Sequence, residues 1–267
     1  MKTSTSKRLR WNIAIWLAAG LFMTGASGMA SGPIMPDPKS EARHQPQVEE
    51  TANGIPLVNI TAPSSGGVSR NEYETFNVPD KGAILNNSYT LSKTELAGYV
   101  QGNNNMAERP AKIIVNEVTG AGSTSMDGFL EVAGNRADVV IANPNGITVN
   151  GGGFINTGKA FLTTGKPVYD GEDHLQRFDI TGGDILIEGK GLGGKETGSL
   201  AILSRAVRIN AGIWAKDLHI TTGANTVDAK TLEASAIEGK GERPAFALDT
   251  AAIGGMYAGR ITLVGTE

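Results

Sequence analysis

Short apolar runs, broken by glycine, asparagine and aspartate, follow one another along the chain from about residue 53 to its end. The clearest runs are KIIVNEV, ADVVIA, ITV, DILIEG, SLAILS, AVRI and LHITTG. Apolar stretches of this length that are rich in β-branched side chains and bounded by turn residues are typical of β-strands. The spacing of apolar positions that marks an amphipathic helix is almost absent. The pattern therefore predicts an all-β protein.

One hexapeptide pattern occurs twice, because FDITGG at Phe178 to Gly183 returns as LHITTG at Leu218 to Gly223, forty residues later. Two coils of roughly twenty residues each would place these segments one above the other in a β-solenoid. We expect a parallel β-helix, right-handed by the general rule for parallel crossovers. A β-sandwich is the competing architecture, but it would require longer strands with cleaner alternation than this chain shows.

Glycine and asparagine concentrate in the stretch NPNGITVNGGGFIN, Asn143 to Asn156. The chain as a whole has 36 glycines among 267 residues, about twice the usual ~7%. An Asn-Pro pair starts a turn, and an Asn-Gly pair permits positive φ at low cost. An asparagine amide at a solenoid corner can also bond to the coil above or below. We therefore interpret the stretch as the corners of coils.

The first thirty residues have the pattern of a secretory signal peptide. Four basic residues precede an apolar run from Trp11 to Met23, and small residues follow from Gly25 to Ala30. The run is shorter than the ~20 residues that span a bilayer, and no later segment approaches that length. We expect residues 1–30 to direct export and to be removed, with no stable membrane insertion of the rest.

Residues 31–52 differ in composition from the sequence that follows. The segment is rich in proline, glutamate and glutamine and has few large apolar side chains. Such a segment buries too little apolar surface to offset its ordering entropy. We therefore expect a flexible leader at 31–52 and a folded domain at 53–267.

Charge and cysteine content exclude several classes of function. The formal charge is −3, and residues 1–30 hold four basic and no acidic side chains, so the remainder carries −7. Nucleic acid is therefore a poor partner, since its binding demands a basic surface. The chain has no cysteine, which excludes disulfides, thiol nucleophiles and cysteine metal sites.

Three patterns carry weak chemical signals. GKGLGG, Gly189 to Gly194, fits a dinucleotide fingerprint but precedes a strand pattern where that fingerprint requires a helix. The loop DGEDH, Asp170 to His174, has the oxygen ligands of a calcium site, but solvated charged loops are common. Arg205 and Arg208 would suit a β-helix polysaccharide lyase if carboxylates converged with them. We predict no catalytic residue, no metal and no cofactor.

Several long stretches together resemble a known family. They are GIPLVNITAPSSGGVSRNEYETFNV, AILNNS, NEVTG, EVAGNRADVVIANPNGITVNGGGFINTG, TTGKPV and LSRAVRINAGIWAKDLHITTGANTVD. They resemble the amino-terminal two-partner secretion (TPS) domain of the filamentous haemagglutinin family, whose members include adhesins and contact-dependent inhibition toxins of Gram-negative bacteria. The resemblance implies a β-helix with an N-terminal cap and extra-helical strands. It also implies passage through the periplasm to the surface or medium after recognition by the POTRA domains of an outer-membrane TpsB β-barrel transporter.

The resemblance also assigns two motifs. The family's N-P-N-G is intact as Asn143, Pro144, Asn145 and Gly146, whereas N-P-N-L is degenerate and keeps only Asn103 and Asn105. These motifs either contact the transporter or shape turns. Because relatives continue far beyond the position of Glu267, we expect a truncated form without its passenger. A short surface adhesin that binds host cells or glycans is the alternative function, and a lyase is the third.

Overall fold

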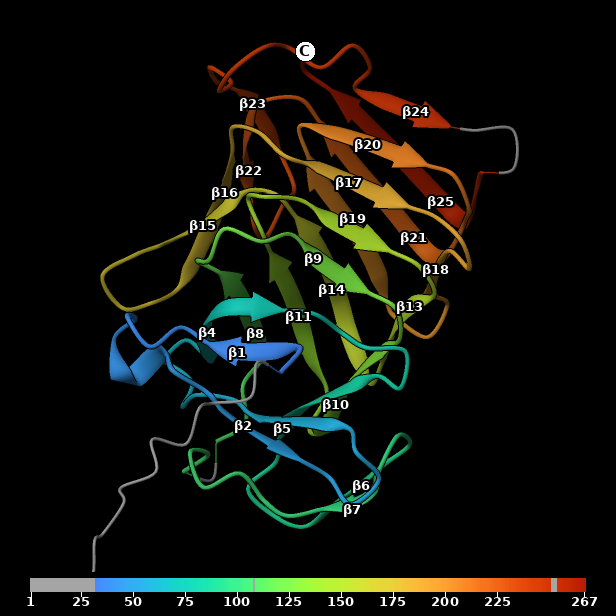
Figure 1. The fold of residues 1–267 in the computed structure, drawn as a ribbon. Helices are drawn as coiled ribbons and strands as arrows, with labels where there is room; N and C mark the ends of the chain where they lie inside the picture. Colours follow the sequence, from blue (N-terminus) through green and yellow to red (C-terminus); the bar gives the residue numbers. More distant parts are fainter. Residues whose placement is uncertain (1–31, 108, 251–253) are drawn as a thin grey trace, which may run out of the picture. The chain divides into compact units, whose positions relative to one another are not determined.

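The structure, a computed structural model, describes residues 32–107, 109–250 and 254–267. The predicted signal peptide lies outside the described residues. Short strands make up most of the described chain, which confirms the all-β prediction (Figure 1). Most of these strands pair in parallel with strands of neighbouring coils, so the chain winds as a parallel β-helix.

Each regular coil contributes one strand to each of three faces. Face A contains β4 (Val68–Phe76), β8 (Ile113–Val118), β11 (Ala137–Ala142), β14 (Thr157–Thr163) and β19 (Ser199–Ser204). Face B contains β3 (Pro56–Asn59), β5 (Ala83–Asn87), β10 (Phe129–Gly134), β13 (Gly152–Ile155) and β18 (Leu192–Gly194). Face C contains β9 (Thr124–Met126), β12 (Ile147–Val149), β17 (Asp184–Ile187), β20 (Ala206–Ile209) and β24 (Leu248–Thr250). Two long strands, β21 (Gly212–Thr222) and β25 (Gly255–Gly265), join faces A and B into one sheet.

The coil length agrees with the prediction, but the predicted pair of repeats does not stack. Val139 pairs with Ala160, so a regular coil takes roughly twenty residues. FDITGG begins in β16 (Leu175–Ile180), an antiparallel strand outside the helix, whereas LHITTG lies in β21. Both segments alternate apolar and polar positions, a pattern that fits any half-buried strand. The similarity of the two segments therefore does not place them in the same sheet.

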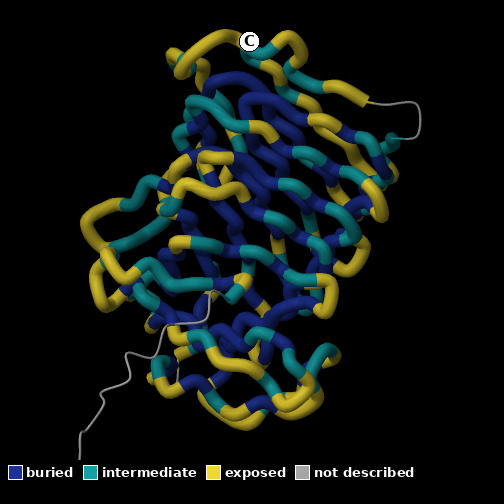
Figure 2. The backbone as a smooth tube through the Cα atoms, viewed as in Figure 1, coloured by how far each residue is buried: buried dark blue, intermediate teal, exposed yellow. Residues whose placement is uncertain are grey.

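Apolar side chains fill the space between the faces and also cover the outside of face A. Buried residues therefore follow one another along the stacked strands (Figure 2). Val139 and Ile141 of β11 point into the central core, while Val140 of the same strand packs outside against Phe178 of β16. The outer layer is an antiparallel sheet of β15 (Lys166–Tyr169), β16, β22 (Asn225–Asp228) and β23 (Ala234–Ala236). These are the extra-helical strands that the resemblance implied. Burial on both sides explains why the runs of face A lack alternation.

The segment that follows residue 31 is folded, which corrects the prediction of a flexible leader. It contains β1 (Ile34–Pro36), the 3₁₀ turn η1 (Ala42–His44) and β2 (Gln47–Glu50). β1 pairs antiparallel with β4, and β2 pairs antiparallel with β3. Ile34 and His44 are buried. Backbone pairing and these two anchors order a segment whose composition alone predicts mobility. A separate hairpin of β6 (Ser92–Thr94) and β7 (Gly98–Val100) lies at the end opposite to the C-terminus (Figure 1).

A row of aromatic and glycine residues crosses the outer surface of face B. Phe129, Gly153, Gly193, Trp214 and Tyr257 occupy paired positions on five successive strands. The Phe129 ring lies over Gly153, where a Cβ would collide with it. The rings of Trp214 and Tyr257 stack with centroids 5.9 Å apart. Docking of β25 therefore fixes the environment of Trp214.

Candidate functional site

The N-P-N-G segment forms the corner between β11 on face A and β12 on face C. Asn143 Oδ1 accepts the backbone N–H of Asn145 at 2.9 Å, and the Asn143 carbonyl accepts the N–H of Gly146 at 3.1 Å. These two bonds close a tight turn of the kind that asparagine initiates. Gly146 has a φ of 108°, and a Cβ there would lie 3.0 Å from the carbonyl oxygen of Asp184. Glycine is therefore required at this position.

The two amides of this turn also bind the preceding coil. Asn143 Nδ2 donates to the carbonyl of Gly122 and to Oγ1 of Thr124, each at 3.0 Å. Asn145 Nδ2 donates to the carbonyl of Gly120 at 2.8 Å. These acceptors follow β8 and lead into β9, one coil earlier. The prediction that corner asparagines link neighbouring coils is confirmed.

Burial divides the turn into two halves. Asn143 has an exposed fraction of 0%, whereas Pro144 and Asn145 are exposed. A buried amide with all these partners is a structural group, because its removal leaves buried donors and acceptors unpaired. The exposed half presents a rigid Pro-Asn surface. The structure thus brings the four residues together but gives them different environments.

The second motif forms the same turn despite its degenerate sequence. Asn103 Oδ1 accepts the N–H of Asn105 at 2.9 Å, and the Asn103 carbonyl accepts the N–H of Met106 at 3.1 Å. Both amides again donate to an earlier segment, here to the carbonyl of Ile60. Met106 is 3% exposed and packs in the central core, so it fills the place of an apolar family residue. Proline is not needed to close this turn.

A buried charged cluster lies outside face A and was not predicted from the sequence. Arg70 Nη2 lies 2.6 Å from Glu72 Oε1 and 3.5 Å from Glu117 Oε2. His44 Nδ1 lies 3.2 Å from the same Glu72 oxygen, and the Arg70 guanidinium lies over the Tyr169 ring. The cluster therefore joins η1, β4, β8 and β15. The only sequence signal was the presence of charges inside strand patterns, in RNEYETF and VNEV.

Burial dominates the electrostatics of this cluster. It raises the pKa of Glu117 to about 7, and the nearby Arg70 only partly opposes the shift. Burial, reinforced by the positive charge of Arg70, lowers the pKa of His44 below its ordinary value. His44 is therefore neutral at neutral pH, and Glu117 lies close to its titration point there.

The arginines considered for a lyase have separate partners. Arg205 is 5% exposed and forms two bonds of 2.9 Å with the Glu267 carboxylate. Arg208 is exposed and lies 3.4 Å from Asp184. Because each arginine is engaged by a different carboxylate, the two do not form one acid-base grouping. The geometry gives no support to lyase chemistry at these residues.

The DGEDH loop is occupied by its own hydrogen bonds. Asp170 Oδ1 accepts the N–H groups of Glu172 and His174, each at 2.9 Å. Asp173 forms a 2.8 Å ion pair with Arg43 of η1. Among the described residues, no group of three or more histidine or acidic side chains is placed to hold a metal ion. The loop instead fastens β15 and β16 to the N-terminal segment.

Comparison with known proteins places the chain in a family. The family model described as "TPS secretion domain" matches residues 33–267. The chain belongs to the TPS secretion domain family. This TPS domain has the fold of a secretion domain of filamentous hemagglutinin in a crystal structure, with a TM-score of 0.81 and 33% identity over 88% of this chain and 80% of that one.

Long relatives carry the same domain. This TPS domain is 48% identical over 83% of its length to the 16S rRNA endonuclease CdiA of Enterobacter cloacae subsp. cloacae. It is 46% identical over 89% of its length to Toxin CdiA of Yersinia pestis. The chain spans only 7% of the length of each of these relatives. No helix within the described ranges is long and apolar enough to cross a membrane.

Proposed function

We propose that this TPS domain is the export signal of a two-partner secretion exoprotein of the filamentous haemagglutinin or CdiA type. The POTRA domains of an outer-membrane TpsB transporter recognise it in the periplasm, and the chain reaches the cell surface or the medium. The observation that carries the proposal is the divided N-P-N-G turn, within a fold shared with a secretion domain. Buried Asn143 fixes the turn, and exposed Pro144 and Asn145 face a partner.

The β-helix architecture suits stepwise export. Each coil buries its apolar side chains against the previous coil, and the corner residues Asn143 and Asn145 bond back to the preceding coil. Stability therefore accrues locally as coils are added. A chain that emerges from its N-terminal end can fold outside without waiting for its last residues.

Secretion by a cognate transporter tests the proposal. The chain would be coexpressed with the TpsB transporter of the Enterobacter cloacae relative, and the fraction released to the medium would be measured. We expect Asn145→Ala to reduce release about tenfold through weaker recognition, the equivalent of ~1.4 kcal/mol. Asn53→Ala is the matched control, since Asn53 is also exposed and its amide also donates to a backbone carbonyl, that of Leu96.

Binding to purified POTRA domains separates recognition from folding. The circular dichroism and unfolding midpoint of Asn145→Ala should stay close to wild type, because the buried bonds of Asn143 are retained. Release of Asn145→Ala at the wild-type rate, or failure of wild-type chain to bind POTRA domains, would contradict the proposal.

A further inference from the structure

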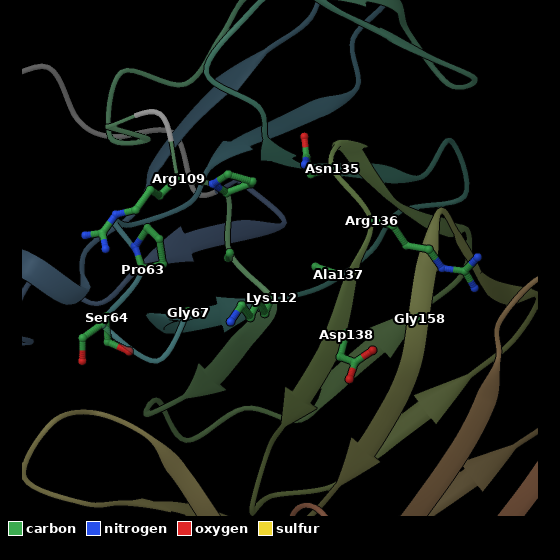
Figure 3. Close-up of a pocket in the computed structure, with 13 residues that line it drawn as sticks. Pro63, Ser64, Gly67, Arg109, Lys112, Asn135, Arg136, Ala137, Asp138 and Gly158 are labelled. Atoms are coloured by element: carbon green, nitrogen blue, oxygen red, sulfur yellow. The ribbon is translucent and has the colours of Figure 1, made fainter.

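A groove of about 660 Å³ lies where four neighbouring strands of face A begin. Its wall follows the starts of β4, β8, β11 and β14, through Gly67, Lys112, Asp138 and Gly158 (Figure 3). Pro63 and Ser64 line this groove and also a smaller one that Asn105 lines. The groove and the Asn103 turn therefore share one surface.

The groove is basic although the protein is acidic. Arg109, Lys112 and Arg136 line it, and Asp138 is the one carboxylate among the described lining residues. Within the described ranges, none of the three basic side chains forms an ion pair. Asp138 Oδ1 accepts the backbone N–H of Lys159 at 2.7 Å. Three cations that form no ion pair with any described residue, in a chain of negative net charge, mark a surface that is complementary to an acidic ligand.

Hydrogen bonds fix the backbone beside two of these cations. Asn87 is fully buried, and its Nδ2 donates to the carbonyls of Ala111 and Asn135, each at 2.9 Å. Those two residues directly precede Lys112 and Arg136. The Arg136 guanidinium is itself anchored by a 2.7 Å bond to the carbonyl of Thr157. The coil corner therefore fixes the backbone positions of Lys112 and Arg136 and the direction of the Arg136 side chain.

The arrangement of the cations favours an extended ligand over a compact one. The guanidinium groups of Arg109 and Arg136 point away from one another, with Lys112 between the two side chains (Figure 3). A single phosphate or sulfate would not reach all three. The mixture of three cations with one carboxylate also gives a modest charge density, which fits a peptide of interspersed acidic residues better than a polysulfated chain.

We propose that this groove binds an extended acidic peptide segment, which under the proposed function belongs to the periplasmic part of the transporter. The identification of the transporter as the source rests on that proposed function. The affinity for acidic peptide follows from the groove alone. Electrostatic contacts of this kind steer encounter and fix register, so the groove aligns the chain while the asparagine turns are recognised.

A peptide-binding measurement tests the groove directly. The protein is purified as residues 32–267, which form a compact unit of their own. A fluorescein-labelled peptide of alternating glutamate and serine is titrated and followed by anisotropy. We expect a Kd below about 1 mM at low salt, and weakening as NaCl rises from ~0.05 to ~0.5 M. The double variant Arg109→Glu, Lys112→Glu should bind about tenfold more weakly.

A charge-matched variant separates the groove from net charge. Lys190→Glu with Lys216→Glu changes two exposed lysines outside the groove and should leave the Kd within about twofold of wild type. Equal weakening by both double variants, or no binding by wild type, would overturn the proposal. Tighter binding of a sulfated oligosaccharide than of the peptide would also overturn the assignment of an acidic peptide.

The two proposals fail in different assays. Absence of peptide binding removes the groove proposal and leaves the secretion test of Asn145→Ala unaffected. Normal peptide binding together with undiminished secretion of Asn145→Ala removes the proposed recognition and leaves the groove intact.

Discussion

Glu117 makes stability depend on pH at the scale of a single residue. Its pKa of about 7 in the folded protein lies above the ordinary 4.5, so the folded state binds more protons than the unfolded state between these values. The contribution of this group to the free energy of unfolding is therefore at its maximum below about pH 4.5, and it is lost as pH rises to about 7. We expect the free energy of unfolding of Glu117→Gln to exceed that of wild type by about 3 kcal/mol at pH 8 and to equal it near pH 4.

Urea unfolding at several pH values measures this difference. His44 acts in the opposite direction, since its lowered pKa removes stability as pH falls through the folded value. Comparing the variant with wild type at each pH removes most of the His44 contribution, because both proteins contain it. A constant difference between the two proteins across the range would contradict the role given to Glu117.

Residues in local turns were predictable, and residues in long-range clusters were not. The N-P-N-G corner followed from the chemistry of four consecutive residues, including the bonds from its amides to another coil. The cluster around Arg70 depends on the register of β4 with β8 and on a turn that precedes both. The same holds for the groove, where Asn87 positions loops that come later in the chain.

At the scale of elements, an ion pair between Arg205 and Glu267 holds the end of β25 in place. Arg205, at the end of β19, binds the Glu267 carboxylate just beyond β25 and also the carbonyl of Lys240. Glu267→Gln would leave a buried guanidinium without its charge partner. We expect a loss of about 2 kcal/mol in the free energy of unfolding, less than for a fully buried pair because the Glu267 side chain is 21% exposed.

Hydrogen exchange and urea unfolding check this clamp. Amides of the loop 238–241 should exchange faster in Glu267→Gln. The exposed Arg208–Asp184 pair provides the control, and Asp184→Asn should cost less than about 0.5 kcal/mol. Equal losses in the free energy of unfolding for the two substitutions would contradict a stabilising role for the Arg205–Glu267 pair.

Elements were predicted where apolar runs are long and missed where order comes from neighbours. KIIVNEV, ADVVIA and SLAILS became β8, β11 and β19. β1 and β2 have weak patterns and are ordered by pairing with β4 and β3. The placement of β16 outside the helix was missed, because its alternation is equally suited to either sheet.

At the scale of the whole molecule, stability should behave as a sum over coils. In a solenoid each coil contacts mainly its neighbours, and β24 and β25 pair only with β20 and β21 within the described chain. We expect deletion of residues 239–267 to lower the unfolding midpoint and to leave the remaining coils folded. Circular dichroism and urea unfolding measure both effects, and complete loss of the β signal would contradict additivity.

The architecture was predicted correctly from evidence that was partly wrong. The twenty-residue coil was inferred from FDITGG and LHITTG, forty residues apart, and the coil length is right although these two segments do not stack. The resemblance implied extra-helical strands, but their places in the sequence, at β15 to β16 and at β22 to β23, were not predicted. No local sequence pattern indicates where the chain leaves the β-helix or where it rejoins it.

The row of rings on face B makes tryptophan fluorescence a measure of whether β25 has docked. Residues 1–30 hold two of the three tryptophans, so Trp214 is the single indole of the remaining chain. It sits on β21, and its ring meets Tyr257 only once β25 has docked. The fluorescence of one native side chain therefore distinguishes a chain whose early coils have formed from one in which β25 has also docked on β21. No dye or added label is needed to follow the docking of β25 during refolding of residues 32–267.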